Sequence, residues 1–341
     1  LEAAEAVGAG GPVEAGMVLD LLSALVDKSL VETEESREEG SSALRYRMLE
    51  PVRQFAREKL AEGQAEVRRR HAEHYLALAE TAEPDLLGAR QGEWFGRLRS
   101  EVWNLRGALS WSLEPGQEEE ERAQELRLRL VAALWRFWDV QGFEEGKRWL
   151  QAALERDPGR YPAARAKALS GLGFILTFQR DYARAIDALE EATTFYKELG
   201  DETGAAFALA NFGWAVLHGD YRERVPVFVE EGKALMKGDL SGPPRAYLRI
   251  ILATAASGEG DLDSAVSQLE EALSLSRELG DLRNLGQSLF ILGNVEIVRG
   301  DFDRGATLLE EGAGYARKLG DRLGTAYYVW VFGKLNALRG K

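Results

Sequence analysis

The feature that most constrains this chain of 341 residues is an internal repeat of about 40 residues. Two turn sequences alternate along it, Leu-Gly-Asp at 199–201, 279–281 and 319–321, and a second turn at 180–182, 219–221, 260–262 and 300–302. In such turns Gly supplies the left-handed residue that ends one helix, and Asp caps the helix that follows. The spacing therefore predicts two helices per repeat. Because helix pairs at a fixed period bury their apolar faces against neighbouring pairs, we expect an all-α solenoid.

Small and large apolar residues recur at fixed places in the two helices. The first helix carries an apolar residue followed by Gly, at Leu172-Gly173, Phe212-Gly213, Leu292-Gly293 and Phe332-Gly333. The second helix carries Ala-x3-Leu-x2-Ala at 185–192 and 265–272, and Gly146, Leu150 and Ala153 fit the same template. Small residues at these places allow close helix packing. We place the repeats over residues 126–341, and we expect the pair that carries Arg224 and Glu231 at the Ala positions to splay.

These offsets, with Pro158 closing one unit, resemble tetratricopeptide (TPR) repeats of the longer, roughly 40-residue kind. The resemblance implies a right-handed α-solenoid with a concave inner wall. HEAT-type helical repeats have a similar period and are the structural alternative. Residues 325–338 repeat the pattern of a first helix with no second helix after it, so we expect an uncapped array that self-associates through this helix.

Residues 1–62 follow a different pattern. Two helices, 1–9 and 17–29, precede two strands, 30–34 and 44–49, joined by a polar loop at 35–42, and a further helix starts near Pro51. This order predicts a small winged-helix domain. Residues 63–125 are then expected to form a helical bridge to the repeats.

Segments across most of the chain resemble one class of bacterial regulators. They are residues 18–30, 46–56, 69–71, 75–79 and 104–111. The class is the STAND-type signal-transduction ATPases, many of which are called LuxR-family or SARP-like transcriptional regulators. The resemblance implies a nucleotide-binding ATPase domain upstream of the winged helix and the sensor repeats. This chain has no G-x-x-x-x-G-K-[ST] loop, so we expect ATP to belong to that missing domain and no cofactor here. The chain begins within a helix and without Met, and we expect it to be a fragment.

Composition excludes several function classes. The chain has 43 Lys plus Arg against 56 Asp plus Glu, a net charge of −13, and no Cys. Disulfides and thiol chemistry are excluded, and no uninterrupted apolar run is long enough to span a membrane. The acidic balance disfavours nucleic acid and anionic membranes, so we expect a cytoplasmic chain with a protein, peptide or small-effector partner. Residues 1–62 hold seven basic and thirteen acidic residues, and we expect no DNA binding by the wing.

Other candidate sites have plainer explanations. His71 and His74 could share a metal ion, but no third ligand is evident, and we interpret them as solvated helix residues. A basic run at 68–70, an acidic run at 118–121 and the Gly-rich stretch at 8–11 are interpreted as a helix face, a helix start and a loop. No nucleophile, base and orienting group stand at a recognisable spacing, so we expect no enzyme activity.

A stripe of residues on the first helices is the candidate binding surface. Its members share a position on the face turned away from the second helix, and most are aromatic: Trp135, Trp138, Phe174, Phe178, Phe207, Trp214, His218, Tyr247, Phe290, Asn294, Tyr327, Trp330 and Lys334, with Lys167, Thr254 and Gln287. Large rings with scattered polar groups suit a concave site for a partly apolar ligand or peptide. The alternative is that these rings are core.

Three functions remain open from the sequence. The preferred one is a sensor region that binds an effector and relays its occupancy to an ATPase and an output domain. The second is a constitutive TPR scaffold for protein assembly, and the third is an enzyme with unrecognised chemistry. The winged helix joined to the repeats favours the first.

Overall fold

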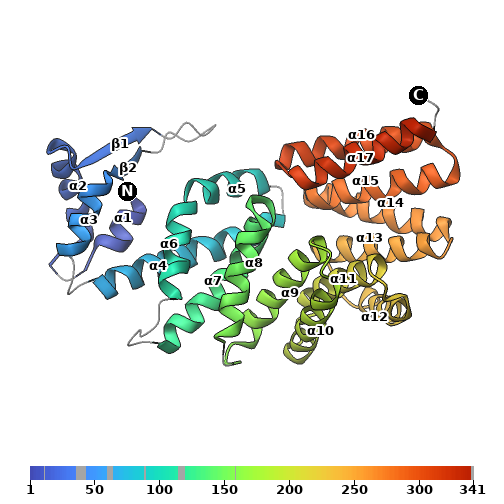
Figure 1. The fold of residues 1–341 in the computed structure, drawn as a ribbon, viewed down its shortest axis with the longest axis horizontal. Coiled ribbons are helices and arrows are strands. Elements are labelled where there is room, and N and C mark those ends of the chain that lie inside the picture. Colours follow the sequence, from blue (N-terminus) through green and yellow to red (C-terminus); the bar gives the residue numbers. More distant parts are fainter. Residues whose placement is uncertain are drawn as a thin grey trace. The chain divides into compact units, whose positions relative to one another are not determined.

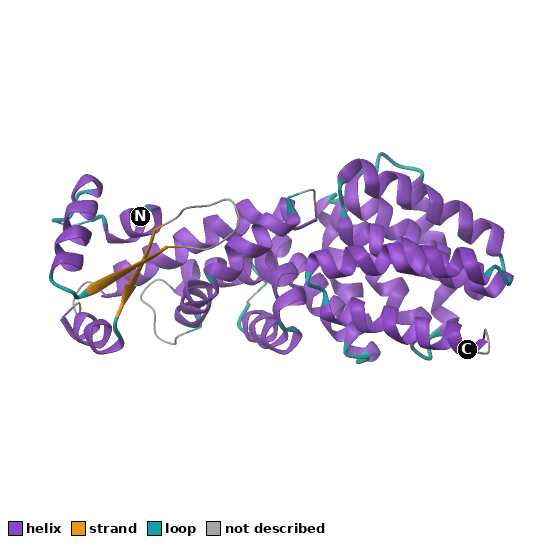
Figure 2. Ribbon diagram, turned by 90° about the horizontal axis from the view of Figure 1, so that it is seen from above, coloured by secondary structure: helices purple, strands orange, loops and turns teal. Residues whose placement is uncertain are grey.

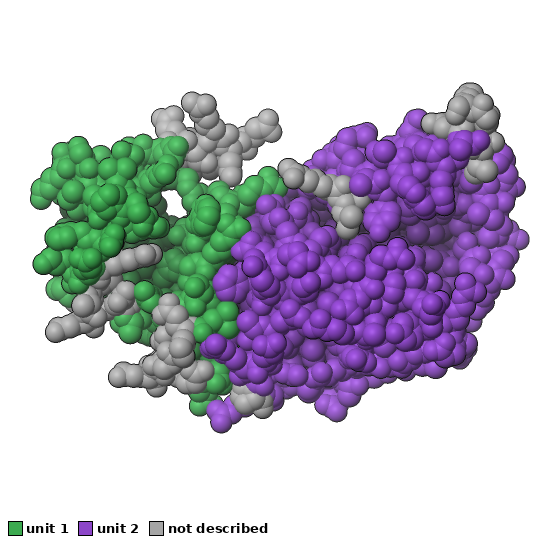
Figure 3. Space-filling model, viewed as in Figure 1, with its two compact units in different colours: residues 1–80, 96–126 green, residues 81–95, 127–341 purple. Residues whose placement is uncertain are grey.

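A computed structural model describes residues 1–10, 12–35, 44–59, 64–87, 90–113, 120–157 and 159–338 (Figure 1). The chain forms two compact units, residues 1–80 with 96–126 and residues 81–95 with 127–341 (Figure 3). Most of the predicted loop at 35–42, Pro158, Gly11 and residues 118–119 lie outside the described residues. Among the described helices, none has the length and apolar run that a membrane crossing requires.

The first 59 residues form the winged helix that the sequence predicts. The order is α1 (Glu2–Gly8), the 3-10 helix η1 (Ala15–Met17), α2 (Val18–Asp27), β1 (Val31–Glu35), β2 (Leu44–Met48) and α3 (Glu50–Lys59). The two strands pair antiparallel with Val31 opposite Met48, and they are the only sheet in the described part of the chain (Figure 2). The predicted helices and strands are confirmed to within two residues at most ends.

The bridge is helical, as expected. It comprises α4 (Gln64–Ala82), the 3-10 helix η2 (Glu83–Leu87), α5 (Gln91–Ser100) and α6 (Val102–Ser112). Within the first unit, Arg45 of β2 donates to the Ser100 carbonyl at 2.7 Å and pairs with Glu101 at 2.9 Å. The Tyr75 hydroxyl of α4 donates to the same carboxylate at 2.9 Å. The wing and the bridge are therefore joined at the end of α5.

The rest of the chain is a succession of helix pairs ending in a single helix (Figure 1). They are α7 (Glu120–Gln141) and α8 (Phe143–Glu155), α9 (Pro162–Phe178) and α10 (Tyr182–Leu199), α11 (Glu202–His218) and α12 (Val225–Met236), α13 (Gly242–Gly258) and α14 (Leu262–Leu279), α15 (Leu282–Arg299) and α16 (Phe302–Leu319), then α17 (Arg322–Leu338). The 40-residue register is confirmed.

Most turns use the chemistry that the sequence predicts, but Gly219 is extended with a φ of −95°, and, among the described residues, the Asp181 side chain makes no cap at the start of α10. Gly200, Gly280 and Gly320 adopt left-handed φ angles of 70°, 66° and 69° at helix ends. The carboxylates of Asp201 and Asp321 each accept from a backbone N–H three residues on, at 2.8 Å. These caps satisfy donors that a helix start otherwise leaves unpaired.

Close approach within three of the pairs, α9–α10, α11–α12 and α15–α16, depends on Gly in the first helix. A Cβ at Gly173 would collide with Leu189, and one at Gly213 would collide with Phe228. The corresponding Gly333 of α17 has open space at its Cβ position. The large second-helix side chains therefore pack directly on the first-helix backbone.

The pair that was expected to splay differs in length. Its second helix α12 has 12 residues, against 18 in α10, and follows a 3-10 turn, η3 (Arg222–Arg224). Arg224 pairs with Glu190 and lies 5.2 Å from the centre of the Phe212 ring. The bulky residue at the Ala position thus lies at the start of a shortened helix.

Replacing Gly173 by Ala should lower the free energy of unfolding by about 1–3 kcal/mol, because the added methyl overpacks the contact with Leu189. Gly333→Ala is the matched control, since the same repeat position is open there, and it should raise stability by up to about 1 kcal/mol. Urea unfolding followed by circular dichroism measures both. Equal effects of the two substitutions would contradict the packing argument.

Candidate functional site

The repeats of the second unit enclose a cavity of about 410 Å³. Residues of α7 to α11 line one side, and residues of α15 to α17 line the other. Helices from the beginning and the end of the array therefore contribute to one site. This volume lies in the range of small-molecule sites.

Four rings form one wall, which we call the aromatic row: Phe143 of α8, Phe178 of α9, and Trp214 and His218 of α11. Phe143 and Phe178 are nearly parallel, with centroids 6.2 Å apart, and so are Phe178 and Trp214. His218 stacks on Trp214 at 4.3 Å. Partial burial lowers the pKa of His218, and the charge of Arg180 lowers it further. The row is a mainly apolar surface that crosses three helices.

The facing wall comes from α15 and α17. Phe290 packs edge-on to Tyr327 with centroids 6.5 Å apart. Tyr327 is 45% exposed and Trp330 is 57% exposed, so both rings can reach a ligand. The Lys334 ammonium lies 3.9 Å from the centre of the Trp330 ring.

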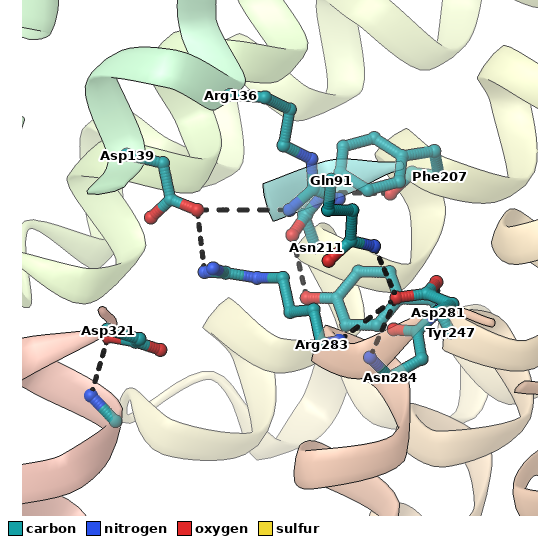
Figure 4. Close-up of polar contacts among 11 residues, drawn as sticks. Gln91, Arg136, Asp139, Phe207, Asn211, Tyr247, Asp281, Arg283, Asn284 and Asp321 are labelled. Carbon is teal, nitrogen blue, oxygen red and sulfur yellow. Dashed lines mark hydrogen bonds and ion pairs between the residues drawn. The ribbon is translucent and has the colours of Figure 1, made fainter. Parts of the chain in front are cut away.

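An ion pair joins the two sides of the site, and we call this pair the cavity floor. Asp139 of α7 lies 2.6 Å from Arg283 of α15, and its second cation, Arg136, is 3.9 Å away (Figure 4). Burial raises the pKa of Asp139, although both guanidinium groups act in the opposite direction. Burial, with the nearby charge of Arg283, lowers the pKa of Arg136 to about 10.

Arg136 is held mainly by aromatic rings. Its guanidinium carbon lies 4.3 Å from the Trp135 ring centre, 4.8 Å from Phe207 and 5.3 Å from Phe174. Its Nε and Nη1 atoms have no hydrogen-bond partner within the described residues. Cation–π contacts and the distant Asp139 carboxylate therefore compensate for its burial.

A second polar cluster fastens the bridge to the inner wall. The fully buried Asp281 carboxylate caps α15 and accepts from Gln91 Nε2 at 3.2 Å. At the other end of this bridge segment, Glu83 pairs with Lys167 of α9 at 2.8 Å. Glu83 of η2 and Gln91 of α5 thus contact α9 and the start of α15, and the start of α15 also lines the cavity.

The structure divides the predicted stripe into two groups. Seven predicted residues line the cavity: Phe178, Trp214, His218, Gln287, Phe290, Tyr327 and Trp330. Five rings are buried in the packing: Trp135, Trp138, Phe174, Phe207 and Tyr247. The expectation that these five lie open on the wall is wrong. Trp135, Phe174 and Phe207 surround Arg136, and Tyr247 packs on Phe207 with centroids 5.5 Å apart. Trp138 packs on Phe137, with centroids 5.1 Å apart. Whether the cavity binds a partner stays a prediction.

Three polar members of the stripe have other roles. Asn294 Nδ2 donates to the Phe290 carbonyl at 2.7 Å, and the Thr254 hydroxyl donates to the Ile250 carbonyl at 2.9 Å. The Lys334 ammonium lies over the Trp330 ring.

Sequence reasoning missed the charged residues of the site. Asp139, Arg180, Arg283 and Asp321 all line the cavity. A usable signal existed for Arg180, which occupies the turn position that Gly260 and Gly300 fill in sister repeats. In the described part of the chain, no three His, Asp or Glu side chains gather as a metal site requires.

Comparisons with known proteins agree with this architecture. The winged helix-turn-helix domain family matches residues 1–61. Proteins of Mycobacterium tuberculosis and Mycobacterium bovis, named as HTH-type transcriptional regulators, are 33% identical over 223 residues, which is 62% of this chain and 24% of theirs. The chain therefore spans about a quarter of the length of the curated relatives it matches.

Solved structures share the repeat fold. A Rap protein in complex with Competence and Sporulation Factor aligns with a TM-score of 0.59 and 14% identity, over 79% of this chain and 72% of that one. Aspartyl phosphate phosphatase F of Bacillus subtilis aligns at 0.50 and 13%, over 95% and 80%. The fold is an α-solenoid of TPR-like repeats preceded by a helical bridge and a winged helix.

Replacing Asp139 by Ala should lower the free energy of unfolding by about 3–5 kcal/mol, since it leaves Arg283 and Arg136 buried without a carboxylate. Replacing Asp139 and Arg283 together by Leu and Met should cost less than the single change. Chemical denaturation measures both.

The control for the Asp139 and Arg283 substitutions is the exposed ion pair of Arg53 and Glu50 on α3. Glu50→Ala should change stability by less than about 1 kcal/mol. A double variant less stable than Asp139→Ala would show that the floor depends on side-chain shape and not on charge compensation.

Proposed function

We propose that this chain is the sensor and interaction region of a cytoplasmic STAND-type signal-transduction regulator. The repeats bind a protein, a peptide or a small effector, and occupancy is relayed to ATPase and output domains outside the chain. The observation that carries the proposal is the cavity with two aromatic walls and a charged floor. Its supports are the winged-helix match, the regulators that resemble this chain, and the Rap structure in complex with Competence and Sporulation Factor.

The position of the cavity would allow a bound ligand to change the helix contacts around it. Its two sides belong to helices far apart in the sequence, so a ligand that draws them together or apart would act on the Asp139–Arg283 pair. Arg283 lies in the first turn of α15, next to the Asp281 that holds Gln91. A shift of α15 would therefore reach the start of α5.

We propose α5 as the relay toward the winged helix. Within the second unit its start is held by Asp281, and within the first unit its end is held by Arg45 of β2. A continuous helix transmits displacement along its axis better than a loop does. The wing would then sense occupancy without contact to the effector.

The wing itself is proposed to be a regulatory packing module. Its α2 exposes Leu19 and Leu21 together with Asp20 and Asp27, and only Lys28 follows as a cation. Such a surface would be repelled by phosphates and suits contact with protein. No catalytic role is assigned to the chain.

Gel-shift titration of this chain against genomic DNA fragments at physiological salt should give no sequence-specific retardation, because an acidic α2 releases few counterions on binding. The measurement is the ratio of affinities for specific and competitor DNA. A retarded band that survives excess competitor would contradict this assignment of the wing.

Trp214→Ala and Phe290→Ala should each weaken effector binding by about 2 kcal/mol or more while the array stays folded, because both rings are only half-buried and face the cavity. Ligands would come from a phage-displayed peptide library and a metabolite panel, and calorimetry would measure affinity. Trp103→Ala is the control, since this ring is 77% exposed in the other unit. Ligands that bind the cavity variants as tightly as the unaltered chain would refute the proposal.

A further inference from the structure

We infer that the cavity takes a ligand in which an aromatic ring adjoins a carboxylate, with the ring on the aromatic row and the carboxylate on Arg180. The inference rests on the proposed function and deepens it by naming the ligand chemistry. Both groups come from the same side of the cavity: Arg180 follows α9 by two residues, and Phe178 is the last residue of α9.

Arg180 occupies a backbone conformation that side chains other than Gly rarely adopt. Its φ angle is +65°, and it stands directly before the N-cap Asp181 of α10. Gly260 and Gly300 hold the same place before Asp261 and Asp301, with φ angles of +87° and +91°. Arg at this position has a conformational energy cost that Gly260 and Gly300 do not have in the corresponding repeats. Because the Arg180 side chain lines the cavity, this cost indicates a function for the guanidinium there.

Arg180 is the cavity arginine whose charge is not paired with a carboxylate among the described residues. Arg283 is committed to Asp139 at 2.6 Å, and Asp321 accepts from the Gly324 N–H at 2.8 Å. Over the residues that the structure describes, the exposed Arg180 side chain has neither a hydrogen bond nor an ion pair. A guanidinium in this state favours a carboxylate, which accepts two parallel N–H bonds.

The aromatic row supplies the other half of the recognition. Phe178 and Trp214 lie within 17° of parallel, and His218 within 21° of Trp214. Their faces and edges favour another aromatic ring over a branched aliphatic group of equal area. Phe290 and Trp330 face the row from the other wall and would close over the ring.

The test compares 2-naphthaleneacetate with 2-naphthaleneacetamide, which keeps the ring and removes the charge. Calorimetry should show the acid binding about tenfold tighter, as a charge-assisted hydrogen bond gives. Arg180→Gln should abolish this preference, and Arg180→Lys should keep part of it. Arg180→Gly removes the strain as well, so it should lose the preference while the thermal midpoint stays equal or rises.

Two further arms separate the sources of this chemistry. Acetylated Gly-Gly-Phe with a free C-terminus and its C-terminal amide test whether a peptide end is accepted in place of a free aromatic acid. Discrimination by both the peptide pair and the naphthalene pair supports the inference, and so does discrimination by one of them, which identifies the source.

Four outcomes overturn the inference. Equal binding of acid and amide in both pairs would leave the cavity as a binding site but refute the anion subsite. Acid preference that survives Arg180→Gln would assign the carboxylate to another group. Absence of binding by every probe would overturn the inference, and so would probe binding that is unchanged in Phe290→Ala. Either outcome refutes the proposed function as well only if the library ligands also bind Phe290→Ala as tightly as the unaltered chain.

Discussion

Close contact between paired helices is the constraint on which the rest of this structure depends. At Gly173, Gly213 and Gly293 the backbone of a first helix receives a large side chain of the second helix. These three pairs are thereby fixed as units, and the first-helix face that points away from the second helix takes no part in that contact. That face is the surface from which both the buried charge cluster and the cavity are built.

The buried charges at the cavity come from helices that lie far apart in the sequence, Asp139 from α7 and Arg283 from α15. A buried ion pair stabilises little by itself, because desolvation offsets most of the Coulomb attraction, but it fixes which groups must meet. Asp139 and Arg283 form the cavity floor, and Arg136 is tolerated beneath them because three rings surround it. The pair selects one closure of the array among the many that apolar contacts alone would allow.

The sequence was sufficient for features set by neighbouring residues. Gly-Asp turns, the helix pairs and the β1–β2 hairpin depend on short-range chemistry, and they lie where the pattern predicts. The pattern could not predict contacts that need the curvature, such as Gln91 with Asp281, which are 190 positions apart. It also could not separate Phe174 from Phe178, which share one helix face four residues apart although only Phe174 is buried.

That last difference has a physical cause in the buried charge cluster, because Phe174 packs on Trp135 and lies 5.3 Å from the Arg136 guanidinium carbon, whereas Phe178 stacks with Trp214 at the cavity. Phe207 is buried near the start of α11, while Trp214 and His218 line the cavity near its end. Glu83 and Gln91 of the bridge make their contacts at the starts of α9 and α15, whereas α9 and α11 line the cavity with residues near their ends. Helix ends carry partial negative charge, which disfavours an anion. Arg180 lies two residues after the end of α9. Its positive charge offsets the partial negative charge of that helix end where a ligand would enter the cavity.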